Sequence, residues 1–217
     1  MKKTYILILF LVSTFAGYSQ TDSSLLHQYK LGFKFKEGIY ANFQQYKQNS
    51  PISKAKIITN IDINRFDFFD VLLQNKTIKV YDNMGEVVEI NSSKIWGFCN
   101  KSVVYINFNS EFNRIPVIGN ISHYIANYTF TEYDPHTSGY NPYQTNYPQT
   151  KTELRQYLLD FNTGKIYDFT YKTVEILIMS DTELYDKYID LSKRKQKKQK
   201  FIYIREFNKK HPIYFPK

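Results

Sequence analysis

The chain has 217 residues and a formal net charge of +9, and aromatic side chains make up 18% of it, including 20 Tyr and 17 Phe. A core of this size needs no disulfide for stability, and a single cysteine, Cys99, excludes a disulfide within the chain. Strand-forming residues are abundant and helix formers are scarce, which favours a fold rich in β-sheet. Trp96 and Phe98 beside Cys99 favour a buried, unreactive thiol over a disulfide to another chain.

The first 19 residues have the pattern of a secretory signal peptide. Two lysines, Lys2 and Lys3, precede an apolar segment at 4–15, and small residues, Gly17 and Ser19, occupy the −3 and −1 positions of a cleavage site. The apolar segment is shorter than the about 20 residues of a membrane-spanning helix, so cleavage is favoured over a retained anchor. No cysteine follows the site for lipid attachment. We therefore expect a periplasmic or extracellular protein that is not a lipoprotein, with 20–217 as one domain.

The first part of the mature chain predicts one short helix and one strand. Asn42 is suited to cap a helix, with Gln45 as its reciprocal partner, and Pro51 marks the end of that helix. Residues 56–64 alternate between apolar and polar, which is typical of a half-buried strand. The apolar segment 66–73 fits either a strand or a short helix.

The middle of the chain predicts an antiparallel meander of about seven to nine strands, flat or curled. Turn residues separate the apolar runs 77–81 and 86–90, 95–99 and 102–108, 112–118 and 121–131, and 154–161 and 166–171. Consecutive runs joined by short turns pair as hairpins. The residues expected on the interior face are Val80, Val88, Ile95 or Trp96, Val104, Ile106, Ile115, Val117, Tyr124, Ala126 and Tyr128.

A Tyr- and Pro-rich insertion at 132–152 interrupts the predicted strands and contains no aliphatic residue. Loops of this length in compact domains are either functional or disordered. Tyrosine offers a large contact area at a small cost in rotamer entropy. One hypothesis is therefore that this loop contacts a glycan or a peptide through Tyr133, Tyr140, Tyr143 and Tyr147, and the alternative is an insertion without a partner.

The C-terminal part changes to helical periodicity. Ser180 and Glu183 form a capping box, and Leu184, Tyr188 and Leu191 form one apolar stripe. The segment 193–200 contains no apolar residue, and a helical stripe resumes from Phe201 until Pro212 ends it. We expect one long or kinked helix in this basic region, 181–210, with its middle clear of the core. The whole chain then predicts an α+β fold, with a short N-terminal helix and C-terminal helices packed on the sheet.

The basic segment is the second candidate contact surface. Basic side chains near an anionic lipid surface contribute about 1 kcal/mol each, and export disfavours nucleic acid as the partner. The alternative is a helix face whose charges only interact with solvent. The residues concerned are Lys193, Arg194, Lys195, Lys197, Lys198 and Lys200.

No motif assigns catalysis, a cofactor or a metal. The four histidines, His27, His123, His136 and His211, are scattered, and HExxH, CxxC, GxSxG and glycine-rich phosphate loops are missing from the sequence. Asp134 with His136 is the nearest approach to a cluster, although Asp-Pro is also common in turns. The favoured function is a non-catalytic binding or structural module of the cell envelope, not an integral membrane protein. A hydrolase-like enzyme acting on envelope polymers and a small outer-membrane β-barrel are the alternatives.

Several segments resemble a family of exported proteins of Bacteroidota to which no activity is assigned. The similar segments are GIYANFQQYKQNSP at 38–51, IWGFCNK at 95–101 with VYI at 104–106, FNRI at 112–115, SDTELY at 180–185 and FNKKHP at 207–212. The similarity spans most of the mature chain but leaves the Tyr- and Pro-rich loop without a counterpart. The resemblance implies export and a shared fold.

Overall fold

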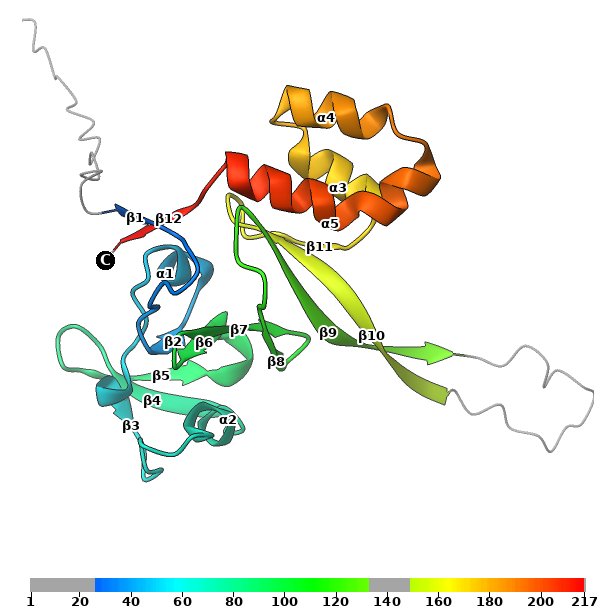
Figure 1. The fold of residues 1–217 in the computed structure, drawn as a ribbon. Helices are drawn as coiled ribbons and strands as arrows, with labels where there is room; N and C mark the ends of the chain where they lie inside the picture. The colour runs from blue at the N-terminus through cyan, green and yellow to red at the C-terminus, as the bar shows by residue number, and fades with distance from the viewer. Residues whose placement is uncertain (1–25, 133–148, 217) are drawn as a thin grey trace, which may run out of the picture.

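The structure is a computed structural model that describes residues 26–132 and 149–216. These residues form twelve strands in four antiparallel sheets and five α-helices (Figure 1), which confirms the α+β class. The predicted signal peptide lies outside the described residues, and so do the four loop tyrosines. Within the described chain, no helix combines the length and the apolar character needed to cross a membrane.

Two sheets make up the lower body in Figure 1. One has the order β2-β6-β7-β8, and its strands are Gly38–Tyr40, Gly97–Asn100, Val103–Phe108 and Glu111–Arg114. The other has the order β3-β4-β5, with strands Ile57–Ile58, Thr77–Tyr81 and Val87–Asn91. The hairpins β4–β5 and β6–β7 confirm two predicted strand pairs. In the second, Lys101 and Ser102 adopt positive φ angles of 48° and 63°, as a tight hairpin turn requires.

Two short helices accompany these sheets, α1 (Phe43–Lys47) and α2 (Phe68–Leu72). Asn42 Oδ1 accepts a hydrogen bond from the Gln45 amide at 2.9 Å, and Gln45 Oε1 accepts one from the Ala41 amide at 2.7 Å. This reciprocal pair satisfies two amides that a helix start leaves without an intrahelical partner.

The strand predicted at 56–64 is wrong beyond its first residues. A 3-10 helix, η2 (Lys54–Lys56), precedes the two-residue strand β3, and the polar side chains of Thr59 and Asp62 then accept hydrogen bonds from backbone amides two residues later. Such local bonds compete with strand pairing. Val88 is also not interior, because 42% of it is exposed.

The third sheet is a long ribbon with the order β11-β10-β9. Its strands are β9 (Ile121–Glu132), β10 (Gln149–Asp160) and β11 (Ile166–Asp168), and the β9–β10 hairpin extends away from the body (Figure 1). The predicted loop 132–152 is too long at both ends, since Glu132 and 149–152 belong to strands. The prediction of one antiparallel meander is also wrong, because β8 and β9 belong to different sheets. An isolated bridge pairs Val117, which follows β8, with His123 of β9.

The C-terminal region forms three helices, α3 (Tyr171–Ile178), α4 (Thr182–Ile189) and α5 (Lys193–Lys210), which pack against the sheet ribbon. The prediction of one long or kinked helix at 181–210 is wrong, because α4 and α5 are separate helices and the chain turns back between them (Figure 1). This turn lets Tyr188 from α4 and Ile204 from α5 share one core with Leu158. The cap of α4 is Asp181, which accepts from the Leu184 amide, rather than the predicted Ser180.

The aromatic residues form the centre of the largest core. Trp96 stacks on Tyr46 with ring centroids 4.5 Å apart, and Cys99 is fully buried, as expected. The fourth sheet pairs β1 (Leu26–Gln28) with β12 (Tyr214–Pro216) and so joins the two ends of the described chain. Phe215 from β12 enters the same core as Trp96 and Tyr46.

Candidate functional site

Helix α5 is held in place by one buried face. Gln196, Tyr203, Ile204 and Phe207 on this face are buried, and their positions at i, i+7, i+8 and i+11 place them on one side of the helix. Near its C-terminal end, Asn208 forms two hydrogen bonds of 2.8 Å with the backbone of Ile121: its Nδ2 donates to the carbonyl, and its Oδ1 accepts from the amide. The opposite side of α5 is therefore fixed facing solvent.

Lys200 does not join the predicted contact surface. Its Nζ donates a hydrogen bond of 2.8 Å to the Phe169 carbonyl and lies 3.8 Å from the centroid of the Phe169 ring. Burial lowers the pKa of this ammonium group. Lys200 thus attaches α5 to the segment before α3, which is a structural use of the charge.

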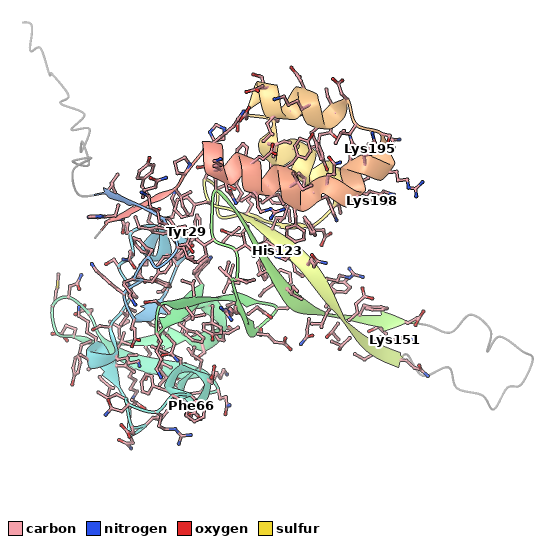
Figure 2. All side chains as sticks on the ribbon, in the orientation of Figure 1. Tyr29, Phe66, His123, Lys151, Lys195 and Lys198 are labelled. Atoms are coloured by element: carbon pink, nitrogen blue, oxygen red, sulfur yellow. The ribbon has the colours of Figure 1, made fainter. Side chains whose placement is uncertain are left out.

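The other five predicted cations are exposed (Lys195 and Lys198 are labelled in Figure 2). Within the described chain, none of them has a carboxylate within ion-pair distance, whereas Lys187 and Lys210 of the same helical unit pair with Glu183. Lys197 Nζ lies 5.7 Å from the Tyr171 ring centroid. The exposed cations are Lys193, Arg194, Lys195, Lys197 and Lys198.

Helical geometry divides these cations into two groups. Lys193 and Lys197 lie on the side of α5 next to α3, as the contact of Lys197 with Tyr171 shows. The others lie on the solvent side, where the helical period adds two more cations and an apolar residue and places one exposed carboxylate, Glu206, at the edge. We call this surface the basic face, and it consists of Arg194, Lys195, Lys198, Ile202, Arg205 and Lys209.

The basic face also contains exposed apolar area. Ile202 is 42% exposed and lies four residues after Lys198, and Phe201, at the edge of the face, is 38% exposed. The signal that reveals Arg205 and Lys209 is the period of 3.6 residues continued through 193–210. A cationic helix face with an aliphatic side chain at its centre is suited to the interface of an anionic membrane.

The charge of the chain is concentrated in this unit. Residues 171–210 contain eleven Lys and Arg and six Asp and Glu, a net charge of +5 out of the total of +9. Ser192, the residue before α5, makes no side-chain capping bond, and the first turn of α5 has no acidic residue. The positive end of the helix dipole therefore adds to the potential of the lysines there.

The histidines and the cysteine within the described residues form no comparable site, and the predicted pair Asp134 and His136 lies outside those residues. His123 Nε2 lies 3.0 Å from Gln156 Oε1, an amide oxygen, and burial lowers the pKa of His123. His211 pairs with Asp181 at 3.0 Å, which closes the end of α5 against the start of α4. Burial raises the pKa of Cys99 to about 12. Across 26–132 and 149–216, no group of three His, Cys, Asp or Glu side chains is placed to hold a metal ion.

Comparison with protein-family models, with curated proteins and with solved structures returned no match.

Proposed function

We propose that the chain is an exported, non-catalytic binding module of the cell envelope and that the basic face of α5 rests on an anionic lipid surface. The observation that carries this proposal is the set of exposed cations on one helix face without carboxylate partners among the described residues. Export is supported by the signal-peptide pattern of the first 19 residues.

The size of the electrostatic contribution follows from the number of cations. Each Lys or Arg near an anionic membrane surface contributes about 1 kcal/mol, and the basic face has five: Arg194, Lys195, Lys198, Arg205 and Lys209. Ile202 adds apolar area that can enter the headgroup region. Exposed charges are screened within about 10 Å at 0.1 M salt and about 3 Å at 1 M salt, so the binding must weaken strongly with salt.

Co-sedimentation with lipid vesicles tests the proposal. We expect binding to phosphatidylcholine vesicles that contain one quarter phosphatidylglycerol, and no binding to pure phosphatidylcholine. The triple variant Arg194→Gln, Lys198→Gln, Arg205→Gln should weaken binding by a factor of about 100, the equivalent of about 3 kcal/mol.

A matched control removes the same charge elsewhere. Lys76, Lys94 and Lys101 are exposed on the lower body, and their triple change to Gln should leave vesicle binding within a factor of about three of the parent, because these side chains lie outside the basic face. Equal losses for the two triple variants would mean that net charge alone causes the binding. Binding that persists in 1 M salt, or no binding of the parent protein, would contradict the proposal.

A further inference from the structure

A groove of about 640 Å³ lies at the N-terminal end of α5, on the side of that helix next to α3, where α3 meets the end of α4 and the start of α5. This volume is within the range of small-molecule sites, about 300–1,000 Å³. Its apolar side chains include Ile176 of α3 and Ile189 of α4, which are 60% and 41% exposed, together with Leu191. Exposed isoleucines at a concave junction of three helices form an apolar surface without a cover in the described chain.

Charge defines the rim of the groove. Lys172 and Lys193 line it, and neither is within ion-pair distance of a carboxylate of the described chain. Glu175 is the one carboxylate among the lining residues, so the lining side chains carry a net charge of +1. Tyr171, also in the lining, lies under Lys197 on the next turn of α5. The groove therefore combines an apolar floor with a cationic rim that includes Lys193 of α5.

We propose that this groove binds one acyl chain of an anionic lipid, with the chain on Ile176 and Ile189 and the headgroup between Lys172 and Lys193. This inference rests on the proposed function, because it takes its ligand from the anionic surface under the basic face. It adds a specific single-molecule site to a general electrostatic attraction.

The walls of the groove favour a lipid over an extended peptide. All three walls are α-helices, whose central amide and carbonyl groups are already paired within the helix. A peptide bound in an extended conformation needs partners for its own backbone, which an exposed strand edge supplies and a helix side does not. An acyl chain has no such requirement. The free amides in the first turn of α5 are donors for its anionic headgroup.

Calorimetric titration with monomeric lysolipids tests the site. We expect the purified protein to bind lysophosphatidylglycerol, below its critical micelle concentration, with a stoichiometry of one and at least tenfold more tightly than lysophosphatidylcholine of the same chain length. Equal affinity for the two lysolipids, or no binding of the anionic one, would overturn the proposal. Binding of a Leu- and Glu-containing peptide without binding of the lysolipid would also overturn it and identify a peptide site.

Two single charge changes at the rim should act in opposite directions. Lys193→Gln should weaken binding of the anionic lysolipid and Glu175→Gln should strengthen it, each about fivefold, the effect of one charge about 4 Å away in water. Both changes should leave the affinity for lysophosphatidylcholine as it was. If both variants weakened binding, the headgroup would not lie at this rim and the assignment would fail.

The floor of the groove is tested with a matched apolar control. The double variant Ile176→Ser, Ile189→Ser should weaken lysolipid binding more than tenfold, whereas Met84→Ser, Val87→Ser on the exposed β4–β5 hairpin should leave it unchanged. Vesicle binding through the basic face should survive the groove variant, and lysolipid binding should survive the basic-face triple variant. If the parent protein bound the anionic lysolipid but not the anionic vesicles, only the proposed function would be contradicted. If the parent bound the vesicles but not the lysolipid, only the groove site would be contradicted.

Discussion

Asn208 connects the helix that carries the basic face to the sheet ribbon, and its removal has a calculable effect. Its side chain forms two hydrogen bonds of 2.8 Å with the amide and the carbonyl of Ile121, at the first residue of β9. Each bond contributes about 0.5–1.5 kcal/mol net. We expect Asn208→Ala to lower the free energy of unfolding by about 2 kcal/mol and the Tm by about 4–8 °C for a chain of this length.

Urea denaturation followed by circular dichroism measures this change, with an unaltered m-value as evidence that the unfolded state is the same. Asn162→Ala is the control, because its Nδ2 bonds to Asn120 Oδ1 at an exposed position, and we expect a loss below about 0.5 kcal/mol. Gly119→Ala should disturb the same hydrogen bonds, since a Cβ at this position would clash with the side chain of Asn208. The double variant with Asn208→Ala should therefore lose less than the sum of the two. A loss for Asn208→Ala no larger than that of the control would refute the reasoning.

Three further predictions concern buried polar groups and the start of α5. Tyr46→Phe should keep or raise the free energy of unfolding, because the fully buried Tyr46 hydroxyl has no hydrogen-bond partner in the described chain. Tyr188→Phe should lower it by about 1 kcal/mol, because the Tyr188 hydroxyl donates to the carbonyl of Tyr171 or Gln196. Urea unfolding compares the two variants, and an equal loss would contradict this prediction. Burial lowers the pKa of His123 from its usual value of 6.5, so at a pH just below 6.5 the unfolded state binds more protons than the folded state. The free energy of unfolding should therefore fall as the pH drops from 6.5 toward the folded pKa. This decline should be smaller in His123→Gln, and an identical pH profile of the two proteins would contradict the prediction. Arg194→Glu, in the first turn of α5, should raise the Tm at low salt while weakening vesicle binding, and a lower Tm would contradict the dipole argument.

Local turn chemistry was sufficient to predict several hairpins from the sequence. The β4–β5 turn contains Asn83 and Gly85, and Gly85 adopts a φ of 84°, a conformation that glycine reaches without strain. In the same way, the tight turn at Lys101 and Ser102 fixes the pairing of Phe98 with Tyr105 in β6 and β7. These features depend on residues close together in the sequence, so a pattern of alternation and turn residues contains the information.

Pairings between distant segments were not predictable in this way. β1 pairs with β12, with His27 opposite Phe215, although nearly the whole described chain separates them. Nothing in the polar segment around His27 indicates a partner, because the pairing depends on where Phe215 packs in the aromatic core. The division into four sheets has the same origin.

The candidate surface shows the same limit at single residues. The predicted contact surface at 193–200 included Lys200, whose ammonium group donates a hydrogen bond to the Phe169 carbonyl in the fold. The predicted surface also left out Arg205 and Lys209, which the helical period places on the same exposed face as Lys198. The sequence specifies the period of a helix, but the packing of α5 on α3, α4 and β9 decides which side of the helix is exposed.

The position of the cations on α5 is unfavourable for the helix itself. The positive end of a helix dipole favours acidic residues, as Asp181 and Glu183 at the start of α4 illustrate, yet α5 begins with Lys193, Arg194 and Lys195 and has no acid in its first turn. Like charges four residues apart, such as Arg194 and Lys198, add a further cost of about 0.2–0.5 kcal/mol. An anionic surface bound at this end of α5 would offset both the unfavourable interaction with the helix dipole and the repulsion between the like charges. A substitution that stabilises the isolated protein and weakens its binding to anionic vesicles is therefore the signature that separates a binding face from a helix face that is only solvated.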